Sequence, residues 1–474
     1  MSPPMNDAEV AAGLQTAAAH SHHVSSSVTL LFAALLVGLI LCLAFEEKLH
    51  AKKSLIAGAF AVVSLLLGAA FDLLPFGALT NVFHEDLPIP AYIQGIDWAV
   101  IAIILGSSLF VDVTSRSGLF TWIAIKLTKV SGGDPLRLLW FYGLMTVVFS
   151  AVLNNVTAMI IVGSLTAVSL DKLRRRDKLL GFLLIEGLLT NVGGLLTLIS
   201  SVPNIIVGTT AGISFVRFFV VAAPFVVVAT AATVWVGARQ FRVVGLANDA
   251  ERAEAAALVA GFDENDGIDS RPFFNFAAVM TVLFIGTIAS TSALPWISDL
   301  GMGYVAMAFA VVMLVRYKSE VDQFYRAVDW DLLGFFAALF VVINVMEHAQ
   351  VLALIGKGLA AIIGLGETLG AGLMLVSAAG FSSVTDNIPL AAMLAKILGG
   401  MGTPSDSGLW WSVIFGANLG GNITPIGSAS TLVAVTIIHK HGLPMTFGGF
   451  VKVAAPYAAL QLALATVYVL VFLN

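Results

Sequence analysis

Several stretches of this chain are apolar over the length that a helix needs to cross a bilayer. A spanning helix takes about 20 mostly apolar residues, and such runs include 28–45, 54–72, 216–237, 273–294 and 447–473. Of the 474 residues, 58% are hydrophobic and 11% are charged, whereas soluble domains carry roughly 25% charged residues. A protein core cannot bury such a surplus. The sequence therefore predicts an all-α polytopic membrane protein whose main partner is the lipid bilayer.

Lysine and arginine collect in separate groups, and their positions predict how the chain threads. The main groups lie at 48–53, 116–137, 172–178 and 239–271. Because cytoplasmic loops collect Lys and Arg, we expect these groups inside and both chain ends outside, in a bacterial-type inner (plasma) membrane. The spans then alternate only if 137–170 and 368–400 are re-entrant hairpins that enter and leave on one side.

The two halves of the chain repeat the same motifs in the same order. "SAVLNNVTAMI" (150–160) matches "SSVTDNIPLAA" (382–392), and "NVGGLLTLISS" (191–201) matches "NLGGNITPIGS" (418–428). The loop after the first hairpin is strongly basic, whereas "MGTPSDSG" after the second has no Lys or Arg. The copies should therefore have opposite orientation, as in the inverted-topology repeats of many secondary transporters.

This pattern divides the chain into six parts. They are a mobile tail (1–27), N-terminal spans with an external loop (28–96), repeat 1 (97–237), a cytoplasmic linker (238–272), spans linking the repeats (273–328) and repeat 2 (329–474).

Polar residues interrupt the apolar segments at matching places in both repeats. "NNVT" and "TDNIP" should form the hairpin tips, and the Asn-x-Gly-Gly motifs should unwind one helix in each repeat. Exposed helix ends bind anions at N-termini and cations at carbonyl ends. The alternative is close helix packing by small residues with interhelical hydrogen bonds. The candidate substrate- or ion-binding residues are Asn154, Asn155, Thr157, Asn191, Gly193, Gly194, Thr197, Asn204, Asn387, Asn418, Gly420, Gly421, Asn422, Thr424 and Ser428.

Asp386 is the single residue of the sequence that points most directly to a function. A carboxylate at mid-membrane is costly and therefore indicates function, so we expect Asp386, with Glu186, to carry the coupling proton or cation. A structural hydrogen bond within its own hairpin is the rival interpretation of Asp386. Asp112 and Glu347 lie near span ends and are expected to be interfacial.

Other chemistry leaves no signature in the sequence. We find no phosphate-binding loop, zinc-ligand spacing, basic nucleic-acid patch or Ser/His/Asp arrangement. The longest polar loop, 238–272, is too short for a nucleotide-driven motor. We therefore expect no enzyme, no catalytic residues, no cofactor, no nucleic-acid partner and no metal site beyond one for Na⁺.

The motifs resemble those of a known family. At "LNNVTAM", "TNVGGLLTLISSVPNIIVG", "TDNIPL" and "GANLGGNITPIGSAS" the sequence is similar to the citrate-transporter-like ion transporter superfamily, in its branch of arsenite-efflux permeases, the P protein and D-type sodium/proton antiporters. The resemblance implies two inverted repeats, each with a re-entrant hairpin and an unwound helix. It also implies a homodimer with elevator-like movement.

Two departures from this family pattern affect the expected chemistry. Asn154 stands where relatives in the P-protein and D-type groups usually have Asp, and Ser200-Ser201 stand where they tend to have Gly-Asp. These changes weaken a sodium site in the first repeat. The Ser-Asn-Thr tips of the dicarboxylate branch are not reproduced either, which argues against a carboxylate substrate.

These observations predict a secondary active transporter. The leading hypothesis is proton-coupled export of an inorganic ion, either arsenite or antimonite, or sodium in exchange for protons. The alternative is sodium- or proton-coupled symport of an organic anion such as citrate or a dicarboxylate. A passive channel ranks below both, because nothing in the sequence resembles a selectivity filter.

Overall fold

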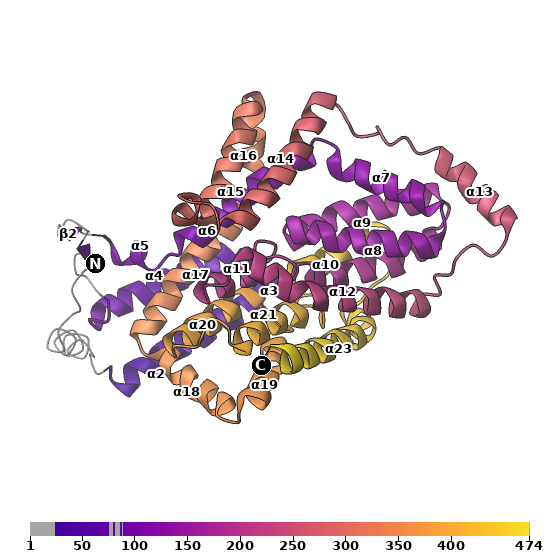
Figure 1. Ribbon diagram of the computed structural model, residues 1–474. Coiled ribbons are helices and arrows are strands. Elements are labelled where there is room, and N and C mark those ends of the chain that lie inside the picture. The colour runs from indigo at the N-terminus through magenta and orange to yellow at the C-terminus, as the bar shows by residue number, and fades with distance from the viewer. Residues whose placement is uncertain (1–23, 75–78, 81–85, 88, 474) are drawn as a thin grey trace.

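The computed structural model describes residues 24–473 apart from 75–78, 81–85 and 88, and this part of the chain is almost entirely helical (Figure 1). Of the expected N-terminal tail, residues 1–23 lie outside the described residues. The first described helix begins at Ser26, with Ser25 as its N-cap.

Nine helices among the described residues are long and apolar enough to cross a membrane. They are α2 (Ser26–Ala44), α4 (Lys53–Ala70), α6 (Trp98–Ser115), α8 (Pro135–Val152), α12 (Phe215–Gln240), α14 (Arg271–Ser290), α15 (Ile297–Arg316), α17 (Trp330–His348) and α23 (Phe447–Phe472).

The other helices complete the bundle. They are α3 (Glu46–Leu49), α5 (Ala91–Gln94), α7 (Leu119–Ser131), α9 (Asn155–Lys172), α10 (Leu179–Gly193), α11 (Val202–Thr210), α13 (Asp249–Ala260), α16 (Val321–Ala327), α18 (Val351–Ile363), α19 (Glu367–Ser382), α20 (Asn387–Gly400), α21 (Gly408–Gly420) and α22 (Ala429–Lys440). Two 3₁₀ turns, η1 (Arg176–Lys178) and η2 (Lys318–Glu320), precede α10 and α16, and the short strands β1 (Leu79–Thr80) and β2 (Asp86–Leu87) pair antiparallel.

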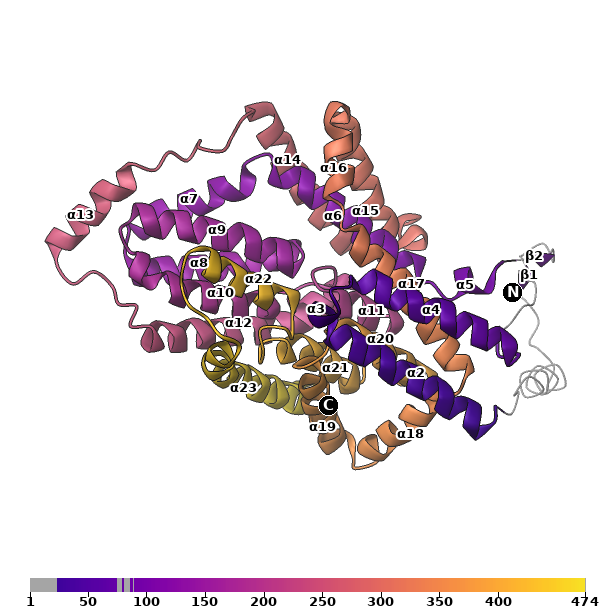
Figure 2. The ribbon, with the colours of Figure 1, turned by 180° about the vertical axis from the view of Figure 1, so that it is seen from behind.

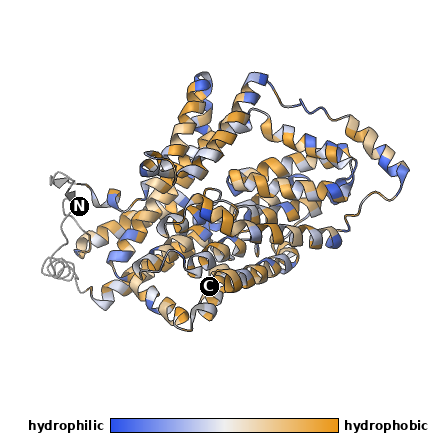
Figure 3. Cartoon of the chain, viewed as in Figure 1, coloured by the Kyte–Doolittle hydropathy of each residue, from blue (hydrophilic) through white to orange (hydrophobic). Residues whose placement is uncertain are grey.

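Large apolar side chains cover the outside of this bundle. Val62 and Leu66 on α4 and Val282 on α14 are 66%, 70% and 72% exposed. Figure 3 shows the same pattern over most of the helices, with hydrophilic residues gathered at α13 and at helix ends. Such a surface suits lipid, so the chain is an integral membrane protein.

The two halves contain the same order of helices. In the first half, α6, α7, the pair α8–α9, the pair α10–α11 and α12 follow one another, and α17, α18, α19–α20, α21–α22 and α23 follow in the second. α6 and α17 run in opposite directions. Gly95, before α6, lies against Asn344 near the end of α17. Arg116, after α6, donates a 2.7 Å hydrogen bond to Gln323, which precedes α17.

The halves pack into each other rather than side by side. α4 packs along α17 and α15 packs along α6, while α11 contacts α20 and α22 contacts α9. Figure 2 shows α22 beside α9 and α10, although these helices are far apart in the sequence. Residues from both halves therefore meet at the centre of the bundle.

The first hairpin is an antiparallel helix pair held at its base by the linker. Tyr142 on α8 and Ser169 on α9 share a 2.7 Å hydrogen bond. At the base, the Asp134 carboxylate accepts from the Leu246 amide at 2.9 Å. α13 extends along the edge of the molecule beyond this point (Figure 1). Further along, Glu264 pairs with Lys126 at 2.7 Å, and this interaction lowers the pKa of the Glu264 carboxyl.

Local chemistry explains where helices break. Asn154 caps α9 by accepting from the Thr157 amide at 2.8 Å. α10 ends at Gly193 and the chain resumes helix at Val202, followed by Pro203 in the first turn, where a proline loses no hydrogen bond. In the second half the same gap separates the end of α21 at Gly420 from the start of α22 at Ala429.

Candidate functional site

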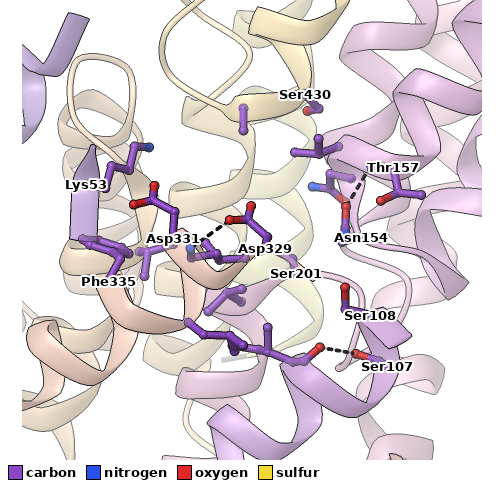
Figure 4. Close-up of a pocket in the computed structure, with 18 of the residues that line it drawn as sticks. Lys53, Ser107, Ser108, Asn154, Thr157, Ser201, Asp329, Asp331, Phe335 and Ser430 are labelled. Carbon is purple, nitrogen blue, oxygen red and sulfur yellow. Dashed lines mark hydrogen bonds between the residues drawn. The ribbon is translucent and has the colours of Figure 1, made fainter. Parts of the chain in front are cut away.

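A cavity of about 750 Å³ lies where the first hairpin tip meets two interrupted helices (Figure 4). The interrupted helices are α10–α11 and α21–α22, each broken by the gap described above. Both halves of the chain contribute to its wall. The lining segments are the α2–α4 connection (46–53), one face of α6 (104–112), the first hairpin tip (152–157), the gap before α11 (199–205), the segment entering α17 (327–335) and the first residues of α20 and α22. In Figure 4, Lys53 and Asp331 lie across the cavity from Asn154 and Thr157.

Among the helices that begin at the cavity wall are four from the hairpins and the interrupted helices, namely α9, α11, α20 and α22. Side chains cap three of them, since Asn154, Asp386 and Ser428 each accept a hydrogen bond from a first-turn amide. Ser201 begins α11 and makes no such bond within the described residues. Helix N-termini carry partial positive charge and free amides, so their convergence favours a solute with negative charge.

Charged side chains sit on the opposite wall. Asp331 is held by Ser54, whose amide donates at 3.3 Å and whose hydroxyl donates a second bond. Asp329 caps α17 through the Leu332 amide at 3.0 Å. Asp112 also lines the cavity, and its buried Oδ2 has no hydrogen-bond partner in the part of the chain that the structure describes. Asp112 is thus a wall residue of the cavity, which the sequence analysis treated as interfacial.

At the inner wall of the cavity, the two interrupted helices cross and are joined by asparagines. Asn191 donates to the Asn422 side chain at 2.8 Å, and Asn418 donates to the Asn204 side chain at 2.9 Å. Ser201 donates to Asn418 at 2.7 Å. The four asparagines are fully buried. This network satisfies polar groups in the crossing and fixes the relative position of the two halves.

The candidate residues divide into two sets. Asn154, Asn155, Thr157, Asn191, Asn387 and Ser428 line the cavity. The remainder lie behind the wall, where they take part in the helix crossing or allow neighbouring segments to pack closely. They are Gly193, Gly194, Thr197, Asn204, Asn418, Gly420, Gly421, Asn422 and Thr424. For this second set, the structure displays the hydrogen bonding and close packing that the sequence analysis kept as an alternative.

Asp386 has two partners at the tip of the second hairpin. Its Oδ1 accepts from the Ile388 amide at 3.0 Å, which caps α20. Its Oδ2 lies 2.6 Å from Nζ of Lys53. The sequence analysis considered the cap but not the lysine, which it grouped with loop residues. The two residues are 333 positions apart, and no local pattern links them.

Glu186 lies apart from the cavity, fully buried on α10. Thr166 on α9 donates to its Oε1 at 2.6 Å. Its Oε2 has no hydrogen-bond partner among the described residues. A buried carboxyl with one unpaired oxygen is a candidate to hold a proton.

Comparisons with known proteins agree with this architecture. The profile of the CitMHS family, described as citrate transporter, matches residues 40–414. An uncharacterized transporter of Mycobacterium bovis is 30% identical over 415 residues, which cover 86% of this chain and 92% of the relative. The P protein of Homo sapiens is 24% identical over 506 residues, covering 90% of this chain and 60% of that protein.

The fold also resembles a solved structure. The crystal structure of the YdaH transporter of Alcanivorax borkumensis superposes with a TM-score of 0.56 at 14% sequence identity, covering 89% of this chain and 98% of that one. At this identity the likeness concerns the fold alone.

Proposed function

This chain belongs to the CitMHS citrate transporter family and is a membrane transporter, and we propose that it moves a small organic anion such as citrate or a dicarboxylate by secondary active transport. The observation that carries the proposal is the convergence of four helix N-termini, together with Lys53, on one cavity. Both features attract carboxylates. They outweigh the missing Ser-Asn-Thr tips, which had placed organic anions second in the sequence analysis.

The proposed transport cycle uses two inverted repeats with re-entrant hairpins. Contacts at the ends of the interrupted helices support this arrangement. Thr210, at the end of α11, lies against Gly399 near the end of α20, the helix that directly precedes α21. Arg176, beside the start of α10, donates to the His441 carbonyl just after α22 at 3.2 Å. The two interrupted helices therefore run antiparallel, as opposite orientation of the repeats requires.

The remaining parts of the proposal rest on the family resemblance and on charge. We propose a homodimer with elevator-like movement, in a bacterial inner membrane, with both chain ends outside. Asp386 and Glu186 are the proposed carriers of the coupling cation or proton.

A second candidate substrate is an inorganic ion or neutral hydroxylated solute, as in proton-coupled export of arsenite, antimonite or sodium. The aspartates Asp112, Asp329 and Asp331 in the cavity wall favour this candidate, because they would repel an anion and accept hydrogen bonds or a cation.

Uptake into proteoliposomes tests the two candidates against each other. We expect labelled citrate or succinate to accumulate when an inward sodium or proton gradient is imposed, and an ionophore to abolish this accumulation. Glu186→Gln should remove the dependence on a proton gradient if the proton is the coupling ion. Exchange of arsenite or sodium for protons, without carboxylate uptake, would contradict the anion proposal and support the second candidate.

Asn154→Ala tests the role of the first hairpin tip. It removes the cap of α9 at the cavity, and we expect at least tenfold lower uptake, equivalent to about 1.4 kcal/mol. Asn248→Ala is the matched control, because Asn248 caps α13 in the linker by the same bond, to the Glu251 amide at 2.8 Å. Loss of a cap costs about 1 kcal/mol at either place. Equal uptake by the two variants would exclude a special role of the tip.

A further inference from the structure

Lys53 and Asp386 form an ion pair at the edge of the cavity. The Nζ to Oδ2 distance is 2.6 Å, and the two side chains are 30% and 13% exposed, respectively. Glu46 is a second carboxylate near this lysine, with 3.7 Å between Nζ and Oε1. Lys53 itself lines the cavity, as do Asn387 and Ile388, which directly follow Asp386.

The pair joins two separate parts of the bundle. Lys53 is the first residue of α4, which packs along α17 and is bonded to it through Ser54 and Asp331. Asp386 caps α20, which packs against α11 and α21 among the interrupted helices. The ammonium group therefore reaches the second hairpin tip from a helix outside the interrupted-helix core.

A carboxylate that is mostly buried is stabilised by a positive partner, and a mostly buried lysine is stabilised by a negative one. In the structure each group satisfies the other. A cation that bound Asp386 alone would leave Lys53 without its closest partner, and an anion that bound Lys53 alone would leave Asp386 uncompensated. If a solute carboxylate and a cation enter together, two neutral pairs replace one, and no charge is left unpaired.

We infer that Lys53 is a built-in substitute for the coupling cation, which an anionic solute removes from Asp386 so that the cation can bind there. This inference rests on the proposed transport of an organic anion. It assigns to Lys53 both the recognition of a solute carboxylate and the obligatory link between solute and cation. Because the coupling is a free energy shared by two sites, solute should tighten cation binding as much as cation tightens solute binding.

Cation flux without solute is the readout that tests the inference. Proteoliposomes would hold wild type, Lys53→Gln, Asp386→Asn or the double variant, and flux of the driving cation (sodium or proton, as the uptake assay defines it) would be measured with no citrate present. We expect negligible flux in wild type and at least tenfold more in Lys53→Gln, because Asp386 is then open to a cation. Asp386→Asn and the double variant should show none.

Citrate kinetics complete the test. In Lys53→Gln the KM for citrate should rise at least tenfold, and Lys53→Arg should restore coupled uptake. Lys357→Gln is the control and should leave both readouts unchanged, since Lys357 is exposed on α18, does not line the cavity and has no ion pair within the described residues. The double variant keeps a neutral pair at this position, so it guards against a folding defect in the single variants.

The outcomes separate the two levels of the account. The inference would be overturned if the wild type takes up citrate while Lys53→Gln has an unchanged KM for citrate and no solute-free cation flux. The proposed function would then still stand. Absence of carboxylate uptake by wild type would overturn the proposed function, and with it the role of Lys53 toward a solute.

Discussion

Asn418→Ala will lower the thermal unfolding midpoint of the protein in detergent by several degrees and reduce uptake to background. Asn418 is fully buried in α21 and bonds to Asn204, to Ser201 and to the Ile414 carbonyl, at 2.9, 2.7 and 2.8 Å. Truncation leaves the Asn204 oxygen and the Ser201 hydroxyl without these partners. Each buried unpaired group costs about 1–3 kcal/mol, so the expected loss is about 2–6 kcal/mol.

A matched control separates this effect from any Asn→Ala change in a spanning helix. Asn275 is exposed on α14, and Asn275→Ala should leave both the midpoint and uptake unchanged. If Asn418→Ala were as stable and as active as Asn275→Ala, the asparagine network would not hold the crossing together.

Gly420→Ala should be similarly damaging, for a steric reason. A Cβ at Gly420 would lie 2.4 Å from the Ala379 carbonyl oxygen and 2.7 Å from its Cα, which is well inside contact distance. Both neighbours are backbone atoms of α19, so neither can rotate away. Overpacking of this kind typically costs 1–3 kcal/mol, and roughly the upper end is expected here. The midpoint should fall and uptake should be lost, because α19 carries the second hairpin tip.

Gly380→Ala is the control, and it should not lower the stability of the protein. Gly380 lies in α19 beside Ala379, and a Cβ there meets no described atom within 4 Å. Alanine is favoured over glycine in a helix by about 1 kcal/mol, so stability should stay level or rise. Equal destabilisation by the two substitutions would show that the close approach of α19 and α21 is not what limits stability.

Much of this architecture could be predicted from local sequence. Apolar runs of spanning length mark the long helices, and the chemistry of Asn, Gly and Pro marks the breaks at 153–154, 194–201, 383–386 and 421–428. These are local properties of the backbone. Repetition of the motifs in both halves then makes the shared order of helices predictable, because equal patterns form equal elements.

The site itself was only partly predictable, because it depends on which segments meet. Asn154 and Asn191 line the cavity, whereas Asn418 and Asn422 lie behind its wall. No sequence pattern separates these asparagines, since all four occur in similar polar motifs. Their roles depend on how the two interrupted helices cross, because the crossing decides which asparagines face the cavity.

Lys53 shows most clearly what a single sequence cannot predict. Basic residues near span ends indicate cytoplasmic loops, and that rule places Lys53 with Lys48 and Lys52. In the structure it begins α4 and reaches Asp386, in the opposite half of the chain. An isolated sequence gives no signal for such a pairing, although an alignment of relatives could reveal correlated changes at positions 53 and 386.

The most direct test of the central claim is protection of the cavity wall by the transported solute. In a Cys42→Ala background, which removes the single cysteine, Ser108→Cys and Thr157→Cys place thiols on two segments of the cavity wall, α6 and the first hairpin tip. Ser115→Cys, at the end of the same helix as Ser108, is the control outside the cavity.

The rate of labelling by a membrane-impermeant thiol reagent is measured with and without solute. At about ten times its Kd, the solute should slow labelling at both wall positions roughly tenfold by occupancy and leave Ser115→Cys unchanged. Unaltered labelling at both wall positions, in protein that still transports the solute, would place the binding site elsewhere and contradict the account.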